Sequence, residues 1–257
     1  MNIWRHTPGR ERLYRPSVAT AARMPDCARC PVRDHSLCTG LQPHELPRIS
    51  ELTTVYEAEA GEVLYFEGDA ARHFFTLRRG VVRLVRTFPD GRRSIVGFLH
   101  DGDFLGGRFG ERNYHTTAEA VTKLEYCRIQ VDDLQRLARE YPALEHQLLS
   151  MSADRMDAAE NHIVLLSRKT AAEKVAAFLL ASQEWQDKTD GGEFDLPMSR
   201  SDIADYLGLT IETVSRVMTK LVGNGLITIR DARHISVNDP VELKALARPE
   251  GVDLDDY

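Results

Sequence analysis

Residues 202–216 read DIADYLGLTIETVSR, and this stretch decides the fold of the C-terminal part of the chain. Ser199 or Ser201 can cap a helix that starts just before or within it, and Thr210 can cap a second helix inside it. Gly208 lies between the two helices, where a glycine backbone can take the positive φ of a sharp turn. The pattern predicts a helix-turn-helix. The residues expected to be buried where the helices cross are Ala204 and Val214.

The second of these helices carries side chains that can read DNA bases. Glu212, Ser215 and Arg216 are spaced i, i+3 and i+4, so they project from one face near the helix N-terminus, the end that enters the major groove. Arg216 can donate two bonds to guanine O6 and N7, and Glu212 can accept one from a cytosine amino group. Ser215 can bond a base edge or a phosphate. Candidate phosphate contacts nearby are Thr213, Lys220 and Arg200.

Two β-prone runs follow the helices, at residues 226–229 and 234–237, and they flank Arg230 and Arg233. This spacing predicts a small hairpin wing whose arginines could reach the DNA backbone. The formal net charge of -6 argues against a protein that coats nucleic acid nonspecifically. We therefore expect DNA binding to depend on a local basic surface.

The bulk composition sets the broad class of the protein. A chain of 257 residues with 42% hydrophobic and 28% charged side chains is typical of a soluble protein, and we expect two domains. No apolar run approaches the roughly 20 residues that cross a bilayer, and none follows the N-terminal arginines as a signal peptide would require, so we expect a cytoplasmic protein. The chain has no phosphate loop, His-Glu-x-x-His or nucleophile elbow, which argues against an enzyme.

The first half of the chain has a β pattern. Five short β-prone runs are separated by glycines and by turn sequences such as Pro89-Asp90-Gly91. Short strands with turn residues at regular intervals indicate an antiparallel barrel or sandwich. The runs span residues 63–66, 74–77, 81–87, 94–99 and 124–129.

A long helical stretch is predicted over residues 131–168, with a break near Tyr141-Pro142, and a further helix over 171–186 leads into a polar linker at 187–193. The long stretch has two neighbouring seams, each interrupted by polar or small residues, and either could face a second copy of the chain or its own domain. The interrupted seams, with Arg155 and the adjacent Asp154, suit a dimer of marginal stability. One seam holds Leu144, Leu148, Met151, Arg155, Ala158, His162 and Leu165, and the other holds Leu149, Ser152, Met156, Ala159, Ile163 and Leu166.

The four cysteines suggest a metal site. Cys27, Cys30 and Cys38 form C-x2-C-x7-C, and Cys127 ends a predicted strand that can fold back beside them. In a reducing compartment such thiols are metal ligands or redox groups more often than disulfides, and four thiolates suit an iron-sulfur cluster or a tetrahedral zinc. Two alternatives stay open: a zinc knuckle in which His35 replaces Cys127, or free thiols with Cys127 as a small buried side chain.

With these motifs together, the chain resembles the CRP/FNR family of bacterial transcription regulators, and within it the FNR and FixK/FnrN-like branch with N-terminal iron-sulfur cysteines. The resemblance extends from Cys27 to Val237, and Glu212-x-x-Ser215-Arg216 is similar to the family's TTGAT-reading triplet. It implies an α+β fold with a cyclic-nucleotide-binding-type antiparallel β-roll, a long dimerisation helix and a C-terminal winged helix-turn-helix. The expected parts are an N-terminal segment with the cysteine loop (1–54), the β-roll (55–140), the dimerisation helix (141–170) and the DNA-binding domain (171–257).

The resemblance also implies a function. In FNR-like proteins, cysteines placed like Cys27, Cys30, Cys38 and Cys127 bind an oxygen-labile 4Fe-4S cluster that controls dimerisation. We therefore expect an oxygen-responsive transcription activator that binds a TTGAT-N4-ATCAA-like palindrome as a homodimer and controls genes of anaerobic or microaerobic metabolism. The hairpin at residues 87–93 is expected to lie near RNA polymerase at a promoter.

The chain departs from two other sequence patterns of the family, one around the nucleotide phosphate and one in the cysteine spacing. Cyclic-AMP binders carry Gly-Glu-Leu and Arg-Ser around the phosphate, whereas this chain has Gly106-Gly107-Arg108-Phe109 and Tyr114-His115-Thr116-Thr117, which argues against a cyclic nucleotide. Arg108 is expected to have a structural or surface role. The gap before Cys38 is longer than in enterobacterial proteins and resembles the FnrN-like branch. The rival interpretation is a regulator of the same family with haem, zinc or no cofactor.

Overall fold

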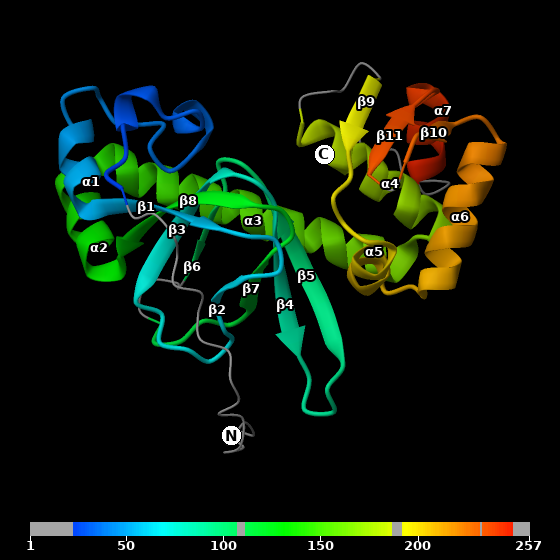
Figure 1. Ribbon diagram of the computed structural model, residues 1–257, viewed down its shortest axis with the longest axis horizontal. Coiled ribbons are helices and arrows are strands. Elements are labelled where there is room, and N and C mark those ends of the chain that lie inside the picture. Colours follow the sequence, from blue (N-terminus) through cyan, green and yellow to red (C-terminus); the bar gives the residue numbers. More distant parts are fainter. Residues whose placement is uncertain (1–22, 107–110, 187–191, 232, 249–257) are drawn as a thin grey trace.

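A 27-residue helix, α3 (Pro142–Arg168), connects a β-rich N-terminal part to a helical C-terminal part in the computed structural model (Figure 1). The structure describes residues 23–106, 111–186, 192–231 and 233–248. Arg108, for which we expected a structural or surface role, lies outside the described residues. Within the described part, no helix is both long and apolar enough to cross a membrane.

The N-terminal part is a roll of two four-stranded antiparallel sheets, with strand orders β1-β8-β3-β6 and β2-β7-β4-β5. The sheets bury a shared core in which Leu77 and Leu105 are fully inaccessible and Leu124 nearly so. Each of the five predicted runs coincides with a strand. Three further strands, β1, β6 and β7, did not stand out in the sequence. The strands are β1 (Thr53–Ala58), β2 (Val63–Tyr65), β3 (His73–Arg79), β4 (Val82–Thr87), β5 (Arg93–Leu99), β6 (Phe104–Gly106), β7 (Thr117–Ala120) and β8 (Leu124–Gln130).

The cysteine segment packs against the start of α3. It contains two short 3-10 helices, η1 (Cys27–Arg29) and η2 (Arg33–His35), and leads into α1 (Leu46–Leu52). Leu37 and Leu41 share one core with Leu144 and Leu148 of α3 and with residues of α2 (Val131–Glu140). Gly40 fits closely against Ala143, since a Cβ there would lie 3.1 Å from the Ala143 side chain. The cysteine segment and the long helix are therefore one packed unit.

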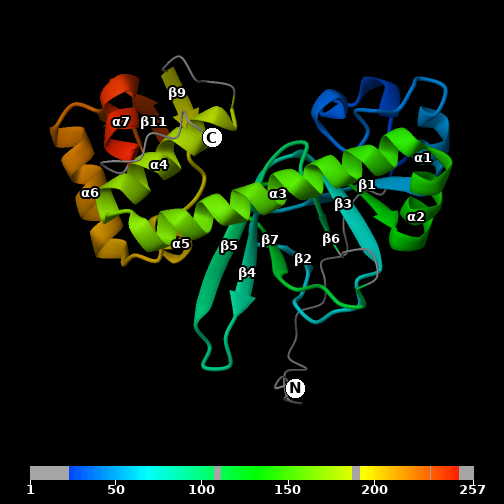
Figure 2. The ribbon, with the colours of Figure 1, turned by 180° about the vertical axis from the view of Figure 1, so that it is seen from behind.

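The structure separates the two seams of α3, which crosses in front of the roll in the view of Figure 2. The first seam faces its own chain, with Leu144 and Leu148 buried. Arg155 belongs to this seam and donates to the Phe104 carbonyl of β6 (2.9 Å), so it does not interrupt a surface offered to a partner. The expectation that the interrupted seams, with Arg155 and Asp154, suit a marginal dimer stays a prediction. The second seam is free, with exposed fractions of 67% at Leu149 and 64% at Met156 and Ile163.

The C-terminal part begins with α4 (Ala171–Glu184), whose N-terminus has a capping box between Thr170 and Glu173. The prediction that the linker runs to residue 193 was wrong at its end, because residues 192 and 193 belong to a strand that pairs with β11. The remaining elements are β9 (Gly192–Asp195), α5 (Arg200–Leu207), α6 (Ile211–Gly223), β10 (Ile227–Ile229), β11 (His234–Val237) and α7 (Pro240–Ala247), with sheet order β10-β11-β9.

The two parts are packed together through β4, β5 and α5. Phe98 of β5 makes an edge contact with Tyr206 (ring centroids 5.2 Å apart) and lies near Phe178. Arg83 of β4 donates to Asp202 Oδ1 at 2.7 Å, an ion pair in which both side chains are mostly buried. The β-roll thus contacts the first helix of the helix-turn-helix directly.

Candidate DNA-reading helix and cysteine pocket

The helix-turn-helix is built by local hydrogen bonds that the sequence specifies. The Ser199 hydroxyl accepts from Asp202 N (3.1 Å), and the Asp202 carboxylate accepts from Ser199 N (3.0 Å). Gly208 ends α5 with φ 62°, the left-handed conformation that a glycine adopts without strain. The Thr210 hydroxyl accepts from Thr213 N (3.2 Å) and starts α6. These caps fix where both helices begin and end.

The first turns of α6 present the predicted reading face to solvent. Glu212, Ser215 and Arg216 are exposed, while Val214 and Met218 on the opposite face are buried in the domain core. Hydrogen bonds from its own backbone N–H and from the Thr210 hydroxyl lower the pKa of Glu212, so its carboxylate stays an acceptor at neutral pH. The arrangement supplies both an acceptor and a forked donor for base edges.

The three candidate phosphate contacts differ in their surroundings. Lys220 is exposed on α6. Thr213 is partly buried, and its hydroxyl bonds to Thr210 (3.1 Å) and accepts from Arg216 (3.4 Å). Arg200 is partly buried, and this burial lowers its pKa. Of the three, Lys220 is the most accessible to a phosphate.

Sequence reasoning missed Ile211, which is 46% exposed at the start of α6 beside Glu212. An exposed apolar side chain at this end of a recognition helix can contact a thymine methyl group. Its position directly after the capping Thr210 was the signal that could have found it. In the wing, Arg230 pairs with Glu193 (2.7 Å), so its charge is shared within the protein.

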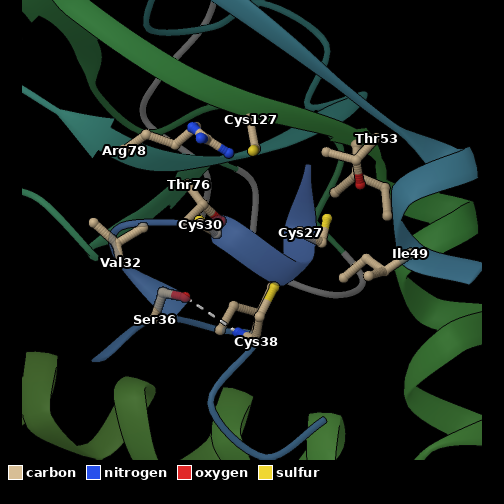
Figure 3. A pocket seen from close by; sticks show the side chains of 12 residues that line it. Cys27, Cys30, Val32, Ser36, Cys38, Ile49, Thr53, Thr76, Arg78 and Cys127 are labelled. Carbon is tan, nitrogen blue, oxygen red and sulfur yellow. Dashed lines mark hydrogen bonds between the residues drawn. The ribbon is translucent and has the colours of Figure 1, made fainter. Parts of the chain in front are cut away.

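The four cysteines, which are far apart in the sequence, line one pocket (Figure 3). Cys27 comes from η1, Cys30 and Cys38 from the loops around η2, and Cys127 from β8. The cavity between them has a volume of about 30 Å³. No carboxylate and no histidine is among its lining residues within the described part of the chain. The other lining residues are Val32, Ser36, Leu37, Ile49, Thr53, Thr76, Arg78 and Ile129.

Burial raises the pKa of three of the pocket thiols, those of Cys27, Cys38 and Cys127. Burial raises the pKa of Cys38 to about 12, and the thiols of Cys27, Cys127 and Cys30 raise it too. Burial also raises the pKa of Cys127 to about 11, against the lowering effect of Arg78. A metal group that binds thiolates here must displace protons, so its uptake releases acid.

Two orphaned polar atoms in the pocket wall suit an anionic group. Arg78 Nη1 and Thr53 Oγ1 are both buried and have no hydrogen-bond partner within the described residues. A buried donor without a partner is costly unless something else satisfies it. Four thiols and two unpartnered polar atoms, in a wall without carboxylates or histidines, fit the donor set of a four-thiolate iron-sulfur cluster.

Cys127 lines the pocket together with Cys27, Cys30 and Cys38. His35 does not line the pocket; its ring and carbonyl lie against Gly102 so closely that a Cβ there would clash. Within the described ranges, no group of three Cys, His, Asp or Glu side chains is arranged around a single metal ion. In a 4Fe-4S cluster each thiolate binds a different iron, so its ligands stand farther apart than those of one zinc ion.

Tyr114, which begins the segment where cyclic-AMP binders carry Arg-Ser, is part of the β-roll core. Its ring stacks on Tyr65 with centroids 3.9 Å apart, and its hydroxyl donates to the His73 carbonyl (3.0 Å). The side chain is only 5% exposed. This segment therefore packs the roll with an aromatic ring.

Comparisons with known proteins agree with both parts of the fold. The profile described as a cyclic nucleotide-binding domain matches residues 56–141, and that of a Crp-like helix-turn-helix domain matches residues 173–246. The nitrogen fixation regulation protein FixK of Bradyrhizobium diazoefficiens is 40% identical over 86% of this chain and 93% of its own length. The chain belongs to the CRP/FNR family of transcription regulators. The transcriptional activator protein FnrL of Cereibacter sphaeroides is 33% identical over 83% of this chain and 88% of its own length.

Among solved structures of this family, FixK2 from Bradyrhizobium japonicum superposes with a TM-score of 0.71 at 34% identity, covering 77% of this chain and 98% of FixK2. A CooA mutant from Carboxydothermus hydrogenoformans has a TM-score of 0.65 at 19% identity over 77% of this chain and 89% of CooA, which supports the fold alone. The expected β-roll, long helix and C-terminal helix-turn-helix are thus confirmed as a CRP/FNR arrangement.

Proposed function

We propose that this CRP/FNR regulator is an oxygen-responsive transcription activator in which Cys27, Cys30, Cys38 and Cys127 hold a 4Fe-4S cluster. The proposal rests on one observation: among the described residues, four cysteines from separate segments line a single pocket whose lining holds no carboxylate and no histidine, and in which the buried Arg78 Nη1 and Thr53 Oγ1 atoms have no hydrogen-bond partner. When bound, such a cluster supplies a group that oxygen can convert. The protein would work in the cytoplasm and control genes of anaerobic or microaerobic metabolism.

The chain's own residues connect this pocket to the proposed dimer interface. Cys38 lies next to Leu37 in sequence, and Leu37 packs in one core with Leu144 and Leu148 at the start of α3. A loaded pocket would tie this loop to β8 through Cys127 and so support the packing of α3. The same helix carries the exposed seam at Leu149, Met156 and Ile163. Pocket loading would then bias dimerisation.

DNA reading follows from the same dimer. Two copies of α6 related by a two-fold axis would meet two half-sites of a palindrome, for which we propose TTGAT-N4-ATCAA. Arg216 and Glu212 would read bases, Ser215 and Ile211 would complete the contact, and Lys220 would bind a phosphate. The β4-β5 hairpin around Pro89-Asp90-Gly91 projects from the roll (Figure 1) and would face RNA polymerase.

The test is duplex binding with and without oxygen. Protein purified under argon is titrated into a fluorescent TTGAT-N4-ATCAA duplex and a scrambled duplex, before and after exposure to air. We expect tight, sequence-specific binding under argon, weaker binding after air, and weak binding at all times for Cys127→Ser. His35→Ala is the matched control and should behave as wild type. Equal binding in argon and air would refute the oxygen response.

A second candidate is a CRP/FNR regulator without a cluster. It is favoured by the pKa of a pocket thiol, since burial raises the pKa of Cys38 to about 12 and so opposes the thiolate form that a cluster needs. In that case Cys127→Ser would bind the palindrome as wild type does. The oxygen experiment therefore decides between the two functions.

A further inference from the structure

Arg78 is a charged side chain in a place where charge is costly. It lies on β3, which pairs with β8 so that Thr76 faces Cys127, and its side chain is only 9% exposed. In Figure 3 its guanidinium points toward Cys127. Burying an ionised group is unfavourable unless its charge and its donors find partners. The partners of Arg78 therefore indicate its role.

The partners that the structure provides satisfy only part of the guanidinium. Arg78 Nε donates to Glu125 Oε1 at 2.5 Å, and the other oxygen of Glu125 is 2.5 Å from Arg23 Nη2. Glu125 is thus shared between two arginines. Among the described residues, Arg78 Nη1 is buried and has no hydrogen-bond partner, and Arg78 and Cys127 line the same pocket. The described lining of the pocket contains no carboxylate.

We propose that Arg78 is a positioning residue for the cysteine pocket: its guanidinium donates to the Cys127 thiolate and to the anionic group bound there, and its charge offsets theirs. This inference rests on the proposed function, because it needs thiolates and a bound cluster. An anion in the pocket would satisfy the free Nη1 donors and the excess positive charge that two arginines leave on one carboxylate. Guanidinium-to-anion hydrogen bonds are among the strong ones in proteins.

A purely structural role makes a different prediction. If Arg78 only anchors β3 to β8 through Glu125, then Glu125→Gln and Arg78→Gln remove the same ion pair and should have equal effects. If Arg78 acts on the bound group, Glu125→Gln leaves the positive charge in place and should spare the cluster. The two variants together separate the roles.

The experiment measures cluster retention without oxygen. Wild type and variants are prepared under argon, their iron and sulfide contents are determined, and the release of iron to a chelator is followed with time. Loss of a hydrogen-bonding partner of a metal ligand costs roughly 10- to 100-fold in metal affinity, so we expect Arg78→Gln to release iron faster than wild type, by up to about that factor. Glu125→Gln should stay within a few-fold of wild type. Arg79→Gln, an exposed neighbour on the same strand, is the matched control.

Each outcome has a defined meaning. Equal release by Arg78→Gln and Arg79→Gln, or by Arg78→Gln and Glu125→Gln, would overturn the inference while leaving the proposed function intact. Wild-type protein without iron and sulfide would overturn both. If circular dichroism shows that Arg78→Gln does not fold, Arg78→Lys replaces it in the experiment, because a lysine side chain lacks the forked N–H donors of the guanidinium. It should release iron several-fold faster than Arg79→Gln, and equal rates would refute the proposal.

Discussion

Ile163→Ala on α3 should weaken the proposed dimer by an amount that the exposed fractions allow us to estimate. Fully burying an isoleucine side chain is worth about 1.5–3 kcal/mol, and the 64% exposure of Ile163 leaves about two thirds of that for a partner, roughly 1–2 kcal/mol. A symmetric dimer contains the residue twice, which gives about 2–4 kcal/mol. Since about 1.4 kcal/mol is tenfold, the dimer dissociation constant should rise roughly 30- to 700-fold.

Sedimentation equilibrium over a concentration series measures this constant. Val164→Ala is the matched control, because Val164 is 51% exposed on the same helix but lies outside the Leu149, Met156 and Ile163 line. The thermal stability of the monomer should not change, since Ile163 contributes little to the core of its own chain. If Ile163→Ala and Val164→Ala dimerise alike, the second seam is not the interface and the reasoning fails.

Three further predictions address DNA reading, capping and pH. Arg216→Ala should lose about 1–3 kcal/mol of DNA-binding free energy per half-site, with a relaxed base preference. Lys220→Ala should weaken binding to all duplexes alike and lower the salt dependence of binding. Fluorescence anisotropy at several salt concentrations distinguishes the two variants. Ser199→Ala should lower the free energy of unfolding by about 1 kcal/mol in urea titrations, while exposed Ser201→Ala should not; equal losses would contradict the capping assignment. Burial lowers the pKa of His100 to about 4, below the unfolded value, so the unfolded chain binds the proton more tightly and stability should fall as pH drops from about 6.5 to 4. His100→Phe, which can keep the stack on Trp185, should flatten that slope in thermal melts, and an unchanged slope would exclude His100 as the cause.

The helix-turn-helix could be predicted because its signals are local. Ser199, Thr210 and Gly208 act within a few residues of where they stand, and each is found in its predicted role. The strands with apolar runs could be found for the same reason. By contrast, β9 (Gly192–Asp195) has a polar, linker-like sequence, and it is a strand because β11 pairs with it. Pairing of that kind depends on tertiary structure.

The cysteine pocket could be predicted from the sequence only in part. The chemistry of four thiols predicted a shared site, although nothing local brings Cys127 beside Cys27. Arg78 was missed because a single arginine carries no spacing signal, and its burial arises only when β3 pairs with β8. The choice between the seams of α3 also needed the fold, since only the packing of Leu144, Leu148 and Arg155 shows which face is already occupied.

The most direct test of the central claim is an absorption spectrum with iron and sulfide analysis on protein purified without oxygen, recorded before and after exposure to air. The account predicts a broad band near about 400 nm, typical of thiolate-ligated iron-sulfur clusters, about four irons and four sulfides per chain, bleaching in air, and loss of the band in Cys127→Ser. A colourless protein, or one that contains only zinc, would contradict the cluster while leaving the CRP/FNR fold and its DNA-reading helix in place.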